Sequence, residues 1–155
     1  MTVSVPPLGT FNFSVTIHAA VPPATGGEIK VGVSDVGGIL GEVNYSDYRE
    51  GDDPNSAIRK IPNTSKAGEV ELKRGIGLGL ELATWFEKIR DGAYDPRTVT
   101  ITLMDGARRG KVDIVLAGCS PKSLTGPTLA GKGGGEVAFE ALKLVCERVD
   151  YRTSA

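Results

Sequence analysis

Thr98-Val99-Thr100-Ile101-Thr102-Leu103 and Lys111-Val112-Asp113-Ile114-Val115-Leu116 are two runs in which apolar and polar side chains alternate. Alternation with a period of two is typical of a strand that buries one face. The Asp105-Gly106 pair between the two runs is a common turn of hairpins. This stretch therefore predicts an antiparallel hairpin and places the chain among proteins built on sheets.

The same alternation recurs elsewhere in the chain and predicts strands over 11–17, 29–34, 41–48 and 70–73. The 155 residues include 21 glycines and 9 prolines, which together make up 19% of the chain. In an average chain these two residue types make up ~12%. Such an excess indicates many turns and favours a mainly β fold. Residues 49–62 are expected to form a long exposed loop, and residues 120–135 a turn-rich connection.

One segment changes period. Its large apolar residues are spaced as on one face of a helix, and they are Leu78, Leu82, Trp85, Phe86 and Ile89. This pattern predicts one α-helix, at about 78–91, that packs on the sheet. Residues 136–149 fit both a helix, because apolar residues recur every four positions, and a strand with a slip in phase. Periodicity leaves the two alternatives open there.

Composition excludes several classes of protein. Lys and Arg number 18 against 19 Asp and Glu, so there is no basic surplus for binding nucleic acid. One histidine and two cysteines argue against a metal site and a disulfide scaffold. Cys119 and Cys146 could pair, but a reducing cytosol favours free thiols.

The chain is expected to form a single domain, 1–155, in which residues 1–10 are a flexible N-terminal segment. It carries no apolar run of ~18 residues, which argues against a membrane span. Its start lacks a basic region and a long apolar core, so no secretory signal is expected. The expected location is the cytoplasm.

An enzyme is not indicated. The lone His18 has no second histidine with which to build a relay, and the sequence holds no Gly-x-Ser-x-Gly elbow. Asp52, Asp53, Glu136 and Glu140 form no evident constellation and are expected on solvated faces. No cofactor, catalytic residue or metal ligand is predicted.

Residues 126–132, Gly-Pro-Thr-Leu-Ala-Gly-Lys, match a phosphate-binding loop as far as the lysine. Gly133 follows where a Ser or Thr would hold magnesium, and Pro127 removes a backbone donor. These departures favour a plain connection between strands. The nucleotide hypothesis also requires a helix over 136–149.

An ordered set of short pieces resembles the tail tube proteins of contractile phages, and equally the inner tube proteins of phage-derived contractile injection systems. The resemblance covers roughly residues 11–151. The pieces are Phe11-Asn12-Phe13, Tyr48-Arg49-Glu50-Gly51, Lys60-Ile61-Pro62-Asn63, Gly68 to Gly75, Leu80-Glu81-Leu82 with Trp85-Phe86, Val99 to Asp105, and Gly135 to Glu140.

The resemblance implies a mainly β (α+β), β-barrel-like, tail-tube-like subunit of antiparallel strands with one packed helix. It further implies a structural protein without catalytic activity. Six subunits would form a ring, and rings would stack head to tail into a hollow tube. Sheath contraction would drive this tube through a target envelope. The implied partners are other copies of the chain, a sheath protein, baseplate or spike and tube-terminating proteins, and cargo in the lumen. The assembled particle would be released or membrane-anchored.

We expect the contacts between subunits and rings to involve two groups of residues. The mixed charges of 49–62 suit salt-sensitive stacking, and Arg74 with Glu136 suits ion pairs between subunits. The predicted interface residues are Tyr48, Arg49, Glu50, Gly51, Asp52, Asp53, Arg59, Lys60, Lys73, Arg74 and Glu136. The alternative function is a monomeric β-rich binding or adaptor module.

Overall fold

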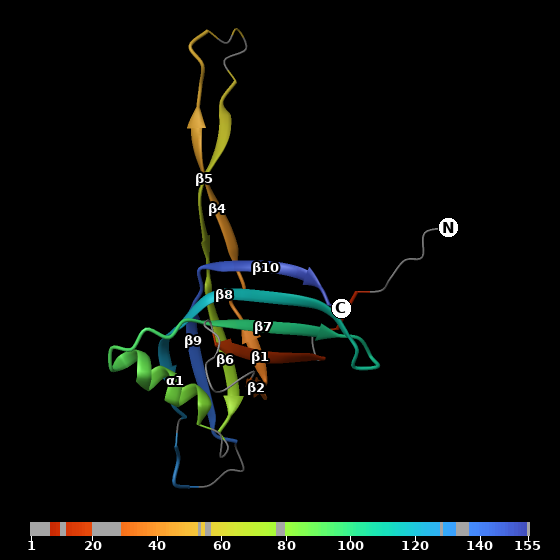
Figure 1. Cartoon of the computed structure of the whole chain (residues 1–155), viewed down its shortest axis with the longest axis vertical. Coiled ribbons are helices and arrows are strands. Elements are labelled where there is room, and N and C mark those ends of the chain that lie inside the picture. The colour runs from red at the N-terminus through yellow and green to blue at the C-terminus, as the bar shows by residue number, and fades with distance from the viewer. Residues whose placement is uncertain are drawn as a thin grey trace.

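The computed structural model in Figure 1 describes residues 7–9, 12–19, 29–52, 54, 57–76, 80–127, 129–132 and 137–154. The described strands are β1 (Phe13–Ala19), β2 (Ile29–Val31), β3 (Asp35–Gly37), β4 (Gly41–Tyr48), β5 (Arg59–Ala67), β6 (Glu69–Gly75), β7 (Arg97–Met104), β8 (Gly110–Thr125), β9 (Phe139–Val145) and β10 (Arg148–Thr153). The helix α1 spans Glu81–Arg90, which confirms the predicted helix.

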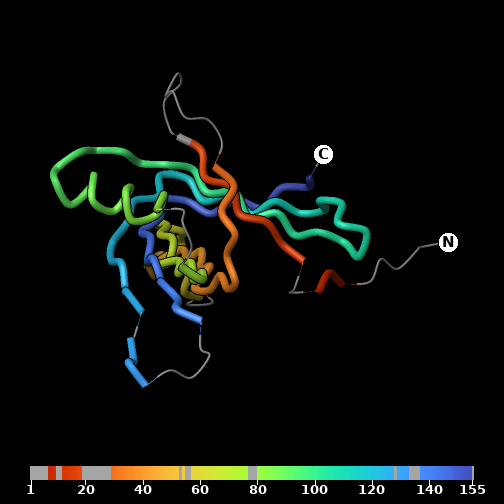
Figure 2. The backbone as a smooth tube through the Cα atoms, turned by 90° about the horizontal axis from the view of Figure 1, so that it is seen from below, coloured from red at the N-terminus to blue at the C-terminus, as the bar shows by residue number. Residues whose placement is uncertain are grey.

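Every pairing between the described strands is antiparallel. The main sheet runs in the order β2-β1-β7-β8-β9-β6-β3, β10 also pairs with β8, and β4 and β5 form a separate pair. The long strand β8 joins two differently directed parts, because its first half pairs with β7 and β10 and its second half pairs with β9. In Figure 1, β1, β7, β8 and β10 run across the molecule while β6 and β9 run along it. The described strands do not close into a barrel, as the view in Figure 2 also shows.

The predicted central hairpin is present as β7 and β8, with Ile101 opposite Ile114 and Leu103 opposite Val112. Its turn is longer than a two-residue hairpin. The Asp105 carboxylate accepts hydrogen bonds from the backbone N–H groups of Ala107 and Arg109, each at 2.9 Å. An aspartate that binds the backbone two residues on in this way closes the turn with its own side chain.

The core lies where the two parts of the sheet face α1. Because side chains alternate along a strand, each of these strands directs one of its faces into the core. The helix contributes Leu82 and Trp85 to the core. The buried apolar side chains are Val15, Ile17, Val31, Val70, Leu72, Leu82, Trp85, Val99, Ile101, Ile114, Leu116, Cys119, Leu142 and Leu144. Phe86 and Ile89 pack partly buried against this cluster, whereas Leu78 lies outside the described residues.

Two predicted loops are shorter than expected. Residues 59–62 belong to β5 rather than to a loop over 49–62, and residues 120–125 continue β8 rather than beginning a connection. Both segments contain a proline, which normally disfavours a strand interior. Pro62 is tolerated because its strand lies in an exposed two-stranded pair. Pro121 is tolerated because the register shifts between it and Ser123.

Of the two alternatives for residues 136–149, helix or strand, the structure has strand, because β9 and β10 cover most of this segment. Strand β9 buries Glu140, Leu142 and Leu144. The expectation that Glu140 lies on a solvated face is therefore wrong. The nucleotide hypothesis is also wrong, because the helix that it requires is replaced by strand.

Candidate assembly surfaces

Strands β4 and β5 form a hairpin that projects from the body along the long axis of the molecule (Figure 1). We call residues 41–67 the arm. Every residue of β4 is exposed, and so is every residue of β5 except Ala67. Among the described residues, no third strand pairs with the arm, although β5 contacts β10 near the base of the arm.

Polar cross-strand contacts hold the two strands of the arm together. Lys60 Nζ lies 2.5 Å from Asp47 Oδ1, and Asn44 Nδ2 donates to Thr64 Oγ1 at 3.1 Å. The register shifts between Val43 and Tyr45, which marks a bulge that increases local twist. These contacts fix the hairpin without burying apolar surface.

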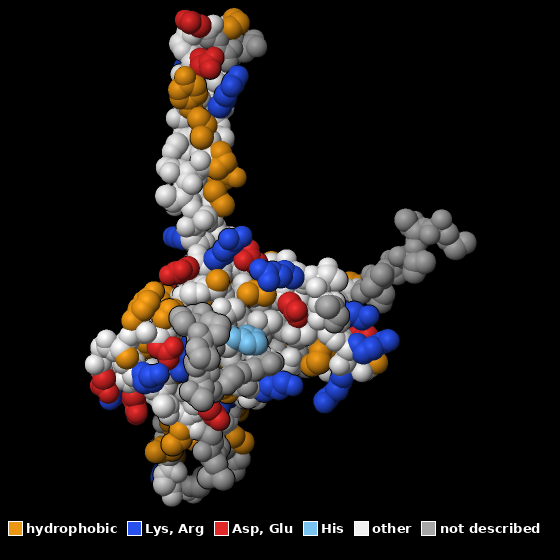
Figure 3. Space-filling model, in the orientation of Figure 1, with side chains coloured by type: hydrophobic (Ala, Val, Ile, Leu, Met, Phe, Trp, Pro, Cys, Tyr) orange, Lys and Arg blue, Asp and Glu red, His pale blue; other side chains and the backbone are white. Residues whose placement is uncertain are grey.

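Large apolar side chains nevertheless lie along the arm, as Figure 3 shows. Tyr45 is 58% exposed and Ile61 is 45% exposed. An isolated two-stranded hairpin is at best marginally stable in water, and a row of exposed apolar side chains marks an interaction site. The exposed apolar residues of the arm are Val43, Tyr45, Tyr48, Ile58 and Ile61.

The structure brings most of the predicted interface residues to the far end of the arm. Tyr48 ends β4, and Arg59 and Lys60 begin β5 directly opposite, with Tyr48 facing Arg59 and Asp47 facing Lys60. Arg49, Glu50, Gly51 and Asp52 follow Tyr48 and are exposed. Asp53 lies outside the described residues.

A second group of exposed apolar side chains lies where β6 ends and β9 begins. In Figure 1 these strand ends lie at the opposite end of the body from the arm. The side chains of this group are 39–63% exposed. The backbone joins the two segments there, because the Ile76 N–H donates to the carbonyl of Ala138 at 2.8 Å. We call this surface the lower patch, and it consists of Ile76, Leu80, Val137 and Phe139.

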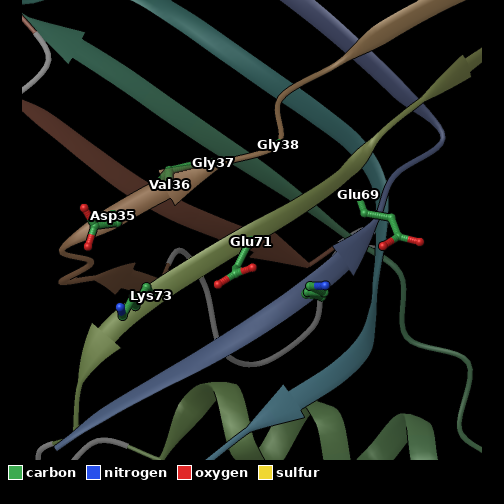
Figure 4. A pocket seen from close by; sticks show the side chains of 8 residues that line it. Asp35, Val36, Gly37, Gly38, Glu69, Glu71 and Lys73 are labelled. Carbon is green, nitrogen blue, oxygen red and sulfur yellow. The ribbon is translucent and has the colours of Figure 1, made fainter.

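Lys73, a predicted interface residue, lies on β6 near the lower patch, with its Nζ 5.4 Å from the Phe139 ring centre. It lines a shallow groove with Asp35 and Glu71 (Figure 4). Opposite charges face each other across the strands of this groove, since Asp35 is opposite Lys73 and Glu71 is opposite Lys143. Cross-strand pairs of this kind stabilise a sheet face exposed to water.

Glu69 extends this charged face and contacts the Lys122 ammonium. The hydrogen bond from Lys122 lowers the pKa of the Glu69 carboxyl. Negative and positive charges on this face therefore balance. The carboxylates of β3 and β6 lie next to lysines of β6, β8 and β9.

Arg74 has a different environment. It is only 8% exposed, and its guanidinium lies 2.5 Å from Glu140 Oε1 and 3.2 Å from Glu81 Oε2 of its own chain. The predicted partner, Glu136, lies outside the described residues. The Arg74–Glu136 pair between subunits stays a prediction, and the contacts that the structure describes link β6 to β9 and α1 within one subunit.

Sequence reasoning missed the apolar side chains of the arm and the partner of β4. The available signal was a few tyrosines and branched residues scattered through 43–61. The pattern predicted the strand over 41–48 but could not identify its partner, because residues 59–67 show no alternation between core and solvent.

Across the described ranges, no three His, Cys, Asp or Glu side chains gather as they would around a metal ion. The same residues include no helix long and apolar enough to cross a bilayer.

Known structures resemble the whole chain. A chain in the anti-feeding prophage tube-terminating cap has a TM-score of 0.81 and 21% identity over 99% of this chain and 96% of that one. A chain in the sheath–tube complex of an extracellular contractile injection system, PVC, in its extended state has a TM-score of 0.78 and 21% identity. That match covers 96% of this chain and 93% of the other. A chain in the anti-feeding prophage baseplate has a TM-score of 0.79 and 18% identity, over 96% of this chain and 97% of the other. No curated protein matches the sequence.

The match to a family model is independent of these structures. The model of the T4-like virus tail tube protein gp19 matches residues 9–150, which is most of the chain and includes the arm, the core and the lower patch. The resemblance predicted from the sequence is confirmed. The chain is a structural tube subunit and belongs to the gp19 tail tube family.

Proposed function

We propose that copies of this chain close into six-membered rings, that the rings stack head to tail into a hollow tube, and that the arm makes the contact between rings. The observation that carries the proposal is the arm itself, a hairpin whose large apolar side chains stay exposed in the part of the subunit that the structure describes. Burial against another copy would give those side chains the apolar contact that stabilises association.

The two apolar surfaces support a head-to-tail arrangement. The arm points one way along the long axis and the lower patch lies at the other end (Figure 1). A contact between unlike surfaces of identical subunits repeats without closing when the copies are related by translation along an axis. Stacking through these two surfaces therefore yields a filament rather than a dimer.

The sheet supplies the second contact, within a ring. Its path ends at β2 and β3, each only three residues long, and neither end strand has an outer partner among the described residues. An unpaired edge favours the addition of a strand from another chain. Edge-to-edge pairing around a ring would close the sheets of all subunits into one large barrel. The related baseplate structure is six-fold symmetrised, which supports six subunits.

The proposed partners follow from the same relatives. Their structures contain a sheath, a baseplate and a tube-terminating cap. We propose that this tube assembles in the cytoplasm, lies within a sheath, ends on a cap and a baseplate, and acts mechanically without catalysis.

The test compares assembly of three proteins by size-exclusion chromatography and negative-stain electron microscopy. The arm variant carries Tyr45→Ser and Ile61→Ser, and the matched control carries Tyr94→Ser, which removes a tyrosine that is 85% exposed and lies off the arm. We expect tubes from the wild type and the control, and rings or small species from the arm variant. Deletion of 52–58 should likewise leave rings that do not elongate.

The melting temperatures of all three proteins should agree within a few degrees, because the substituted side chains are exposed. Tubes of normal length from the arm variant would show that the arm does not join rings. A wild type that stays monomeric at high concentration would overturn the assembly proposal as a whole.

A further inference from the structure

The two cysteines lie in contact at the corner where the two parts of the sheet meet. Cys119 Sγ is 3.1 Å from Cys146 Sγ. Cys119 is fully buried on β8, and Cys146 is half-buried between the end of β9 and the start of β10. Both thiols are free.

The strand register places the two residues directly opposite each other. Ser120 faces Val145 on one side of the corner, and Ala117 faces Arg148 on the other. Counting inward from either pair puts Cys119 opposite Cys146. Directly opposed residues of antiparallel strands have Cβ atoms about 4.5–5.5 Å apart, somewhat beyond the Cβ separation of about 3.5–4.5 Å in a disulfide.

The backbone at this corner is bent. Gly118 has φ +63, and a Cβ there would lie 2.6 Å from the Glu147 carboxylate carbon. The Glu147 N–H donates to the carbonyl of Ala117 at 3.0 Å. The corner thus holds the two cysteine-bearing segments together by backbone contacts on one side and by the β8–β9 ladder on the other.

We propose that Cys119 and Cys146 form a reversible intrachain disulfide when the protein meets an oxidising solution, and that this bond fastens β8 to the β9–β10 corner. The sulfur atoms need to approach by about 1 Å to reach the 2.03–2.05 Å bond length. The bond would enclose residues 120–145, a loop that includes β9. The inference concerns one chain and does not depend on tube assembly.

A small-molecule disulfide can act as the oxidant. The Cys146 thiolate attacks one sulfur of oxidised glutathione, and one glutathione thiolate leaves. Cys119 then loses its proton to water and attacks the Cys146 sulfur, which expels the second glutathione thiolate. The protein loses two protons and two electrons, and one small disulfide becomes two thiols.

The environments of the two thiols support this order of events. The hydrogen bond with Cys119 lowers the pKa of Cys146, which burial opposes. Cys146 is also the more exposed of the two thiols, so it is the accessible nucleophile. The hydrogen bond with Cys146 and burial raise the pKa of Cys119. Once Cys146 is in the mixed disulfide it carries no negative charge, and the main cause that keeps Cys119 protonated is removed.

The experiment treats the reduced protein with oxidised glutathione, alkylates remaining thiols under denaturing conditions and measures intact and peptide masses. We expect a product lighter by two hydrogen atoms, a peptide that links Cys119 to Cys146, and no alkylation. The melting temperature should rise by about 5–10 °C, because a disulfide restricts the unfolded chain. Dithiothreitol should reverse the change.

Variants identify the two roles. Cys146→Ser should take up no glutathione at Cys119 and show no change in melting temperature with oxidant, whereas Cys119→Ala should retain one glutathione on Cys146. The half-buried position of Cys146 makes its serine variant the safer of the two to fold. A wild type that keeps two alkylatable thiols, stops at the glutathione adduct or cross-links only between chains would overturn the proposal.

Discussion

Arg74 Nε lies 2.5 Å from Glu140 Oε1, and both side chains are about nine-tenths buried. The pair spans neighbouring strands, because Arg74 on β6 faces Glu140 on β9. Arg74 also reaches Glu81 in the first turn of α1 at 3.2 Å. The guanidinium therefore joins the sheet to the start of the helix.

Replacing Glu140 should destabilise the subunit. Removing one partner of a buried ion pair costs about 3–5 kcal/mol. We expect about 2–3 kcal/mol for Glu140→Gln, because Glu81 still faces Arg74. Denaturant unfolding measures the loss, and Glu87→Gln on the exposed face of α1 is the control. A loss below about 1 kcal/mol would mean that the pair behaves like a solvated one.

Trp85 should be the main contribution of the helix to the core. It is fully buried, its Nε1–H donates to the carbonyl of Asp95 at 2.9 Å, and the Arg97 guanidinium lies 5.0 Å from its ring centre. Trp85→Ala should cost about 3–5 kcal/mol of unfolding free energy. Trp85→Phe, which keeps a six-membered aromatic ring but loses the rest of the indole and its N–H donor, should cost about 1–2 kcal/mol.

The exposed Tyr94 provides the comparison for Trp85, and Tyr94→Ala should change stability by no more than about 0.5 kcal/mol. Thermal and urea unfolding of the three variants test the order. Equal effects of Trp85→Phe and Trp85→Ala would indicate that the hydrogen bond, rather than the packing, dominates at this position.

Gly38 should tolerate no side chain. It has φ +79, and a Cβ there would lie 2.2 Å from the carbonyl oxygen of Glu69. This glycine precedes the arm, so its conformation directs the chain from β3 towards β4. Gly38→Ala should destabilise by at least about 2 kcal/mol, through strain and a backbone clash.

The adjacent Gly37 is the matched control, because its added Cβ meets nothing within 4 Å. Gly37→Ala should leave the melting temperature nearly unchanged. Similar losses for the two alanine variants would remove the steric explanation.

The protonation state of Asp95 should make the free energy of unfolding depend on pH. Burial raises its pKa, but hydrogen bonds from Arg97 at 2.8 Å and Lys88 at 3.2 Å outweigh burial and lower the pKa below the ordinary 3.8. A carboxyl with a lowered folded-state pKa stabilises fully above its unfolded pKa, and this contribution disappears as the pH falls through the lowered value.

Asp95→Asn should therefore cost about 1 kcal/mol at pH 7, and the difference from wild type should shrink as the pH falls below about 4. Urea unfolding from pH 7 to pH 3 measures both quantities. Asp91→Asn serves as the control, because Asp91 contacts only the exposed Arg90 in the described pairs. A constant difference at every pH would contradict the role of the charge.

The helix and the central hairpin could be predicted because each has one buried face. Leu82 and Trp85 recur on a single helical face, and Val99 and Ile101 alternate with threonines. Strand β9 was undecided because its core-facing positions include Glu140. A charged residue among buried leucines hides the alternation, and its burial depends on Arg74, a residue 66 positions away.

The arm shows a different limit. Strand β5 is exposed on both faces and shows no alternation, and its pairing with β4 includes cross-strand contacts such as Lys60 with Asp47. The mixed charges of 49–62 predicted an interface that includes Arg49 and Lys60, and the fold brings these two residues to one end of the arm. Arg74 belongs to a separate prediction, an ion pair with Glu136 between subunits, and the contacts described for it are with Glu140 and Glu81 of its own chain.

The sequence by itself determined the helix, the central hairpin and the family, because period, turn residues and short motifs are properties of neighbouring positions. Only the tertiary structure decided which charges are buried, where Cys119 meets Cys146, and that the arm leaves the body along the long axis. Those outcomes depend on contacts between residues far apart in the chain, whose free energies no local pattern contains.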